Sequence, residues 1–464
     1  SNYISHPVPM FLQLFVLLPA LLLLCYYRSQ RAACHEPPSP SKMPLIGNLH
    51  QLGPILHRSL FDMSRDHGPL MLLRFGSRPV LVVSSADIAQ EVMKANDLVF
   101  ASRPSLSGFR EIFYNCTNIF CAPYGEHWRQ AKKLCTVHLL SPKRVQSYAA
   151  VREEEVASMV ENIAAWSASS RPFNLSRILN SFANEVITRL AVGKKYFTQG
   201  EECERNVFCE IVEEASHLLG LFDVEDCFPW LGWLSAASTV RARMRRCFRR
   251  FDGILEQVVE EHLGRRRDGG GVKNESGGDL IDVLLSLQGD PDVGSILSRD
   301  TVKAIILDMF GAGTDTSYIT LEWAMAQLLR NGEIMEKVRG EVRGIAKNDS
   351  MVTDDMLSQM TYLDAVIKEV LRLHPAAPML LPREANRDVE IGGYKIRAKT
   401  RVVINAWAIG RDPKYWEAPE EFRPERFVGS PVDFRGQDFH YIPFGAGRRM
   451  CPGVTLAIST IKLA

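Results

Sequence analysis

FGAGRRMCPG, residues 444–453, decides the fold of this 464-residue chain. The stretch fits the pattern FxxGxRxCxG, which places Cys451 on a tight, glycine-bearing loop ahead of a helix. Backbone N–H groups of the loop and the positive end of that helix would both stabilise a thiolate at Cys451. A cysteine thiolate in such a loop is a candidate axial ligand for haem iron. The other cysteines stand in no comparable motif, and we interpret them as small apolar residues.

The composition limits the class of protein. The net charge is +1, from 55 basic and 54 acidic residues, so the chain has no global attraction to nucleic acid. Hydrophobic residues make up 46% and charged residues 23% of the chain, which indicates a folded protein rather than a disordered one. The 10 cysteines include no CxxC pair and no Cys/His set with zinc spacing, which argues against a disulfide scaffold and for a reducing compartment.

The segment Val8–Tyr27 has the character of a transmembrane anchor. Its only clearly polar residue is Gln13, and as a helix it would span about 30 Å, the thickness of a bilayer core. Arg28 and Arg31 follow at once, and the positive-inside rule then places the rest of the chain in the cytosol. A cleaved signal peptide is the alternative, which the small residues Ala32-Ala33 keep open.

Residues 28–45 are predicted to form a basic, proline-rich spacer behind this anchor. The run Pro37-Pro38-Ser39-Pro40 is stiff and cannot continue a helix. Residues 46–464 contain no tandem repeat and no further composition break, so we expect them to form one domain.

The pattern of this domain is mainly helical. Two short apolar runs, Leu70–Phe75 and Pro79–Val83, surround Gly76-Ser77-Arg78 and predict a β-hairpin. Arg265–Gly278 is polar and glycine-rich, as expected of a surface loop. The arginine-rich run Arg241–Arg250 favours a solvated helix face, with a membrane-facing or acidic-partner patch as the alternative. The aromatic stretch Phe222–Leu234 fits either the core or a loop that touches the bilayer.

A long helical pattern without proline, from Arg299 to Arg330, contains a second group of candidate residues. Gly311 and Gly313 each cost a helix roughly 1 kcal/mol relative to alanine. That cost indicates close approach by a flat group or a local distortion, although a slack buried helix is also possible. Asp315 and Thr316 place a carboxylate and a hydroxyl beside the glycines, where they could deliver the protons that O–O cleavage consumes.

Glu369 and Arg372 form an i, i+3 pair on a helix that must end before Pro375. Such a pair is usually an exposed ion pair of small energetic value. Here the apolar neighbours indicate a largely buried helix, so the pair needs a further partner.

Taken together, these motifs resemble those of a microsomal cytochrome P-450 of the plant A-type, a haem-thiolate monooxygenase. The resemblance extends from the anchor to the last residue and implies the P-450 fold, mainly α with a minor β-sheet (α+β). It implies haem b on Cys451, in a loop that includes Phe444. It assigns proton delivery over the distal haem face to Asp315 and Thr316.

The resemblance also supplies partners for isolated residues. Arg426, in the segment PERF, joins Glu369 and Arg372 in a structural triad that braces the haem loop. The haem propionates would be bound by four residues, with Lys132 standing where arginine is usual in the family: Trp128, Lys132, Arg383 and Arg449. The expected substrate contacts are Ala312, Ala377 and Met379.

The implied reaction inserts one atom of O2 into an apolar small molecule of the terpenoid, phenolic, coumarin or oxime type. Electrons would come from NADPH through a separate cytochrome P-450 reductase, because the chain has no flavin or dinucleotide fingerprint. The expected location is the endoplasmic reticulum membrane, in contact with lipid, with the catalytic domain cytosolic. Since the family continues beyond the position of Ala464, the C-terminal end is expected to be missing from this sequence.

Two alternatives remain at this point. One keeps the fold but acts on peroxides, as a haem-thiolate isomerase or dehydratase, and would turn over without reductase or oxygen. The other is a non-enzymatic membrane protein that binds haem or another ligand and would not need Asp315 and Thr316.

Overall fold

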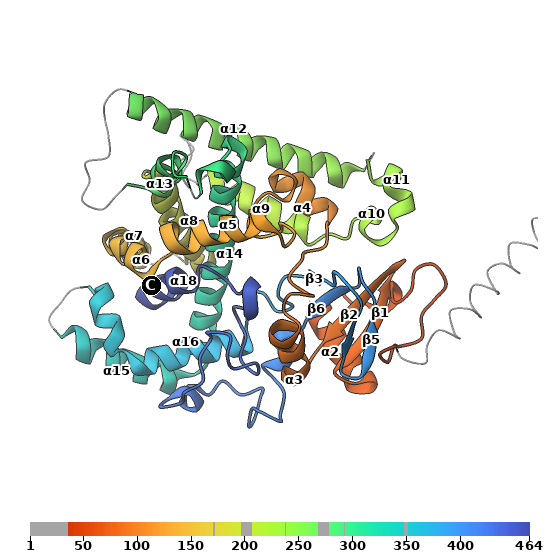
Figure 1. Ribbon diagram of the computed structural model, residues 1–464. Helices are drawn as coiled ribbons and strands as arrows, with labels where there is room; N and C mark the ends of the chain where they lie inside the picture. Colours follow the sequence, from red (N-terminus) through yellow and green to blue (C-terminus); the bar gives the residue numbers. More distant parts are fainter. Residues whose placement is uncertain are drawn as a thin grey trace, which may run out of the picture.

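A small β region lies beside a larger helical region, and the helix α14 (Arg299–Arg330) runs through the middle of the helices (Figure 1). The computed structural model describes residues 36–169, 172–195, 207–236, 238–267, 278–291, 293–347 and 351–464. The first helices are α2 (Leu56–His67), α3 (Ala86–Gln90), α4 (Ser107–Ile112), α5 (Glu126–Leu134), α6 (Pro142–Ser147), α7 (Ala149–Ala168), α8 (Leu175–Val192) and α9 (Val207–Leu219). The later ones are α10 (Val224–Cys227), α11 (Gly232–Ala236), α12 (Thr239–Arg267), α13 (Leu280–Leu287), α15 (Gly332–Ala346), α16 (Thr361–Leu373), α17 (Ala406–Ile409) and α18 (Val454–Leu463).

The main sheet has four strands in the order β1-β2-β6-β3. The predicted hairpin is confirmed, because β1 and β2 pair antiparallel with Leu70 opposite Val83. β2 pairs parallel with β6, and β6 pairs antiparallel with β3, so distant parts of the chain meet in one sheet. A separate two-stranded sheet joins β4 to β5. The strands are β1 (Leu70–Phe75), β2 (Arg78–Val83), β3 (Arg383–Glu384), β4 (Val389–Ile391), β5 (Tyr394–Ile396) and β6 (Arg401–Ile404).

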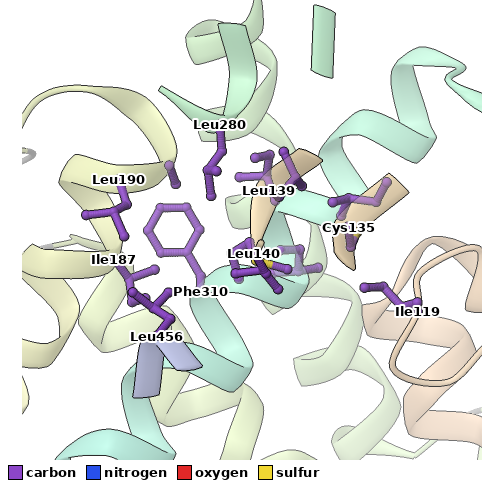
Figure 2. Packing of buried hydrophobic residues seen from close by; sticks show 14 of the residues in the cluster. Ile119, Cys135, Leu139, Leu140, Ile187, Leu190, Leu280, Phe310 and Leu456 are labelled. Carbon is purple, nitrogen blue, oxygen red and sulfur yellow. The ribbon is translucent and has the colours of Figure 1, made fainter. Parts of the chain in front are cut away.

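α14 is held by a core that surrounds it. Its first turn is capped by the Ser298 hydroxyl, which accepts from Thr301 N over 3.1 Å. Figure 2 shows the ring of Phe310, fully buried, lying among Ile187, Leu190 and Leu280 of two neighbouring helices. Burial of such a side chain contributes about 1.5–3 kcal/mol, so the position of α14 is strongly determined.

The structure differs from the sequence-based expectation at three places. Pro37 and Pro40 are buried, and Pro38 O accepts from Leu72 N over 3.0 Å, so this half of the expected spacer lies on the domain. Residues 265–267 belong to α12 rather than to a loop, and residues 268–277 lie outside the described residues. Within the arginine run, Arg241 is buried against carboxylates of other elements rather than solvated.

The predicted anchor 8–27 lies outside the described residues. Among the helices that are described, none is both long enough and apolar enough to cross a membrane.

Candidate active site

The loop around Cys451 is shaped by glycines and by its own backbone hydrogen bonds. Cys451 N donates to Phe444 O over 3.0 Å. Gly447 has φ +69°, and a Cβ there would approach Met93 O to 2.3 Å, so the position requires glycine. The helix α18 starts at Val454, directly behind the loop, as the motif predicted.

Cys451 is partly buried, and loss of solvation raises the pKa of its thiol. A hydrogen bond from Gly453 and the charge of Lys132 act in the opposite direction but do not outweigh burial. A metal cation held at the sulfur would supply positive charge there and would favour the thiolate. The surroundings of Cys451 therefore fit a metal–thiolate bond.

A cavity of about 330 Å³ lies beside Cys451. Its walls come from elements far apart in sequence, including α5, α8, α14 and the cysteine loop, and most of the lining is apolar. The structure brings the following predicted site residues together in this lining: Trp128, Lys132, Ala312, Thr316, Ala377, Arg383, Phe444, Arg449 and Cys451.

Four basic side chains contribute to the wall of the same cavity: Arg103, Lys132, Arg383 and Arg449. Burial lowers the pKa of Arg383 to about 10. Burial and the charge of neighbouring arginines lower the pKa of Arg449 to about 9 and that of Lys132 to about 8. Within the described part of the chain, the only carboxylate at salt-bridge distance from these four is that of Asp97, 3.8 Å from Arg383. This excess of buried positive charge fits a ligand with two carboxylates, as haem has in its propionates.

Backbone carbonyls and one aromatic ring fix these basic groups in place. Arg449 Nε donates to Ala101 O over 2.7 Å, and its guanidinium lies 4.1 Å from the ring of Trp128. Lys132 Nζ donates to the carbonyl oxygens of Arg448 and Met450, the latter over 3.1 Å. Lysine at this position therefore also braces the cysteine loop.

Arg103 was not recognised from the sequence as one of these cations. It is buried and donates to Leu381 O over 2.8 Å and to Pro382 O over 2.9 Å, next to Arg383. The available signal was an arginine two residues after the apolar run Val99–Ala101, where a charged side chain that becomes buried needs partners.

The predicted residues of α14 face different surroundings. Thr316 lines the cavity, and its Oγ1 donates to Ala312 O over 2.6 Å. Asp315 instead accepts a hydrogen bond from the Ser216 hydroxyl of α9, and burial raises the pKa of its carboxyl. Gly311 faces open space, whereas a Cβ at Gly313 would approach Ile187 Cδ1 to 2.5 Å. The second glycine thus leaves room for Ile187 of α8 to pack closely, and α14 shows no break in its helix.

Met379 and the predicted triad lie outside the cavity lining. Met379 packs against the apolar cluster under β1 and β2, which differs from the expected substrate contact. Glu369 is fully buried and receives Arg372 Nε over 2.7 Å and Arg426 Nε over 3.0 Å. The three side chains therefore meet as the resemblance implied.

Comparison with known proteins gives one consistent result. Residues 37–464 match the family model of Cytochrome P450. The chain is 50% identical over 420 residues to Cytochrome P450 71A1 of Persea americana, covering 90% of this chain and 83% of that one. It is 47% identical over 429 residues to strychnine-11-hydroxylase of Strychnos nux-vomica, covering 92% and 83%. A solved structure of a zebra fish cytochrome P450 with abiraterone superposes with a TM-score of 0.71 at 27% identity and 88% coverage of each chain.

The chain belongs to the cytochrome P-450 family. Among its members it is similar to plant enzymes, and it is a haem-thiolate monooxygenase. Enzymes of this family work with a redox partner, O2 and a small-molecule substrate.

Proposed function

We propose that Cys451 is the thiolate ligand of the haem iron and that Arg103, Lys132, Arg383 and Arg449 bind its propionates. The observation that carries this proposal is the single cavity that these residues share with Thr316. When bound, haem supplies the redox chemistry that cleaves O2, with one oxygen atom entering the substrate and the other leaving as water.

The chain's own residues hold the cofactor in the cavity and deliver protons to it. The Trp128 ring lies 4.1 Å from the Arg449 guanidinium and helps to hold this cation at the cavity wall. Thr316 lines the cavity with its hydroxyl proton donated to Ala312 O, so its Oγ1 keeps acceptor capacity there. Asp315 precedes it on α14, with its carboxyl in contact with Ser216. The triad of Glu369, Arg372 and Arg426 has a structural role. Electrons arrive from NADPH through a separate cytochrome P-450 reductase.

The substrate is an apolar plant metabolite of the terpenoid, phenolic, coumarin or oxime type, because the cavity lining is mostly apolar. Relatives are named for the hydroxylation of strychnine and the oxidation of norfluorocurarine, so a test panel includes both compounds. The experiment is a spectral ligand-shift screen of a metabolite extract, followed by mass analysis of products formed with reductase and NADPH. Turnover without reductase or O2 would contradict the monooxygenase reaction.

Thr316→Ala is expected to keep haem bound but to uncouple NADPH consumption from product. The variant removes the Thr316 hydroxyl from the cavity lining, and a positioned group that takes part in proton transfer typically contributes about 100-fold or more. We expect product per NADPH to fall by at least about tenfold while NADPH oxidation continues. Thr316→Ser is the matched control, because serine Oγ can make the same bond to Ala312 O. Equal coupling in both variants would refute the proton role.

We propose that the domain is anchored by residues 8–27 to the endoplasmic reticulum and rests on the membrane through an exposed apolar patch. The patch consists of Leu45, Ile46, Phe222, Trp230 and Trp233, all of which are exposed. Its two parts lie together, because the rings of Phe75 and Phe222 are 6.1 Å apart and Gly76 N donates to Ile46 O. Apolar groups gathered in this way mark an interaction surface.

In vesicles that contain brominated lipid, the patch should place tryptophans within reach of the quencher. We expect Trp230→Phe together with Trp233→Phe to remove most of the lipid-dependent quenching of tryptophan fluorescence in the full chain. Trp416→Phe is the control, since Trp416 is buried and packs against Phe427 in the interior. The same loss of quenching in the control would rule out this contact.

A further inference from the structure

Asp308 is a buried carboxylate in the middle of α14 that the proposed reaction does not use. Its Oδ1 accepts from Asn118 Nδ2 over 2.5 Å, and its Oδ2 accepts from Ile119 N over 2.8 Å and Phe120 N over 3.3 Å. One side chain of α14 thus holds three consecutive residues of the loop between α4 and α5. Charged acceptors form the stronger class of hydrogen bond, so this attachment is firm.

The loop that Asp308 holds needs such an attachment. Tyr114, Asn115 and Cys116, just before it, have φ values of +45°, +54° and +61°. Three consecutive non-glycine residues in the left-handed region are costly, and such backbone persists only when its surroundings determine it.

The same loop is held from its other side by Trp128 and Arg449 of the haem site. Ile119 O accepts from Trp128 Nε1 over 3.1 Å and from Arg449 Nη1 over 3.3 Å. The main chain of Ile119 therefore lies between Asp308, which binds its N–H, and the pair Trp128 and Arg449, which bind its carbonyl.

Beyond this loop lies a second apolar space. A smaller cavity of about 110 Å³ is lined by Phe113, Val212, Leu219 and Phe251, on the side of α9 and α12. Four residues line both this outer chamber and the inner chamber beside Cys451: Phe120, Asp308, Gly311 and Ala312. Because Gly311 and Ala312 are small, the Phe120 side chain is the main bulk at this boundary.

Burial raises the pKa of Asp308 to about 7, and the hydrogen bonds from Ile119, Asn118 and Phe120 oppose that rise. The hydrogen bonds from the loop thus offset part of the desolvation free energy of the buried carboxylate. The protonated carboxyl would lose acceptor capacity for these hydrogen bonds.

We propose that Asp308 is a positioning residue for substrate selection. By binding the Asn118 side chain and the backbone N–H groups of Ile119 and Phe120, it keeps Phe120 between the inner and outer chambers and so limits the length of ligand that the inner chamber admits. This inference rests on the proposed haem site, because the inner chamber is the cavity beside Cys451 in which we place the haem.

The test uses variants of the loop attachment in the full-length, haem-loaded enzyme. Asp308→Asn replaces one acceptor by a donor that faces Asn118. Asn118→Asp in the same chain restores a complementary donor–acceptor pair with the polarity exchanged. Phe120→Ala removes the bulk at the boundary while leaving the attachment intact. Asp223→Asn is the matched control, a buried carboxylate that accepts from Glu225 N over 2.8 Å but lines neither chamber.

The probes are 1-alkylimidazoles from ethyl to decyl, whose ring nitrogen ligates haem iron and whose tail measures the space beyond it. Dissociation constants come from the Soret shift, and the quantity compared is the ratio of Kd for the short tail to Kd for the long tail. Each methylene that leaves water strengthens binding about fourfold, so a merged chamber raises this ratio by at least about tenfold. We expect the rise in Asp308→Asn and Phe120→Ala, and a return to the wild-type ratio in the Asp308→Asn, Asn118→Asp double variant.

The outcomes separate this inference from the proposed function. A wild-type protein without the thiolate-type carbon monoxide spectrum would refute the haem site itself. With that spectrum present, an unchanged ratio in Asp308→Asn, or a uniform weakening for all tails, would overturn the role of Asp308. If Asp308→Asn fails to hold haem, the Kd ratios of Phe120→Ala and of the double variant decide. An unchanged Kd ratio in Phe120→Ala overturns the inference. A Kd ratio in the double variant that differs from the wild-type value also overturns it.

Discussion

Cys451→Ser abolishes the thiolate-type carbon monoxide difference spectrum of the reduced enzyme, and this is the largest effect we expect from a single substitution. A serine hydroxyl is a harder ligand than a thiolate and is not deprotonated at neutral pH, so it cannot replace the sulfur at the metal. The loop itself should remain, because its hydrogen bond from residue 451 to Phe444 O uses the backbone N–H. Monooxygenase activity is lost together with the spectrum.

Cys247→Ser is the control for this result. Cys247 is fully buried on α12, and its Sγ contacts Ile211 O at 3.7 Å, a bond that a serine hydroxyl can also donate. It lines neither cavity, so the spectrum should survive. A thiolate-type spectrum that persists in Cys451→Ser would assign the ligand to another cysteine.

Glu369→Gln is expected to destabilise the fold by about 3 to 5 kcal/mol, the usual cost of breaking a buried ion pair. The carboxylate is fully buried and binds two guanidinium groups, of which Arg372 is almost completely buried. The variant leaves that charge without its counter-ion. Urea unfolding followed by tryptophan fluorescence measures the change, and the fraction of chains that retain haem should fall with it.

The helix α15 offers a matched comparison. Glu336 and Arg339 have the same i, i+3 spacing and lie 2.8 Å apart, but both side chains are exposed. Glu336→Gln should therefore change the free energy of unfolding by less than about 1 kcal/mol. Equal changes in the free energy of unfolding for Glu336→Gln and Glu369→Gln would mean that burial is not the reason why the triad stabilises the fold.

The sequence predicts those parts of the site whose residues are close together along the chain. The cysteine loop, the helix through Thr316 and the pair Glu369–Arg372 each lie within a few residues, so local spacing already determines their relative geometry. The hairpin was equally accessible, because its two strands and its turn are contiguous. Arg426 joined the triad only through resemblance to a family.

The residues that were missed depend on contacts between distant segments. Arg103 finds its acceptors at Leu381 and Pro382, and Asp308 finds its donors at 118–120, far away in sequence in both cases. No spacing rule connects such positions. The different surroundings of Asp315 and Thr316 have a simpler cause, since adjacent residues point about 100° apart around a helix.

The way in which the main chain of Ile119 is anchored has an evolutionary consequence. Its N–H and its carbonyl are both occupied by hydrogen bonds, and the bond from Phe120 to Asp308 also uses the main chain. None of these bonds depends on which side chains stand at 119 and 120. Mutations at these two positions can therefore reshape the pocket while the scaffold keeps its anchorage, which gives descendants of this enzyme a route to new chemistries at little cost in folding.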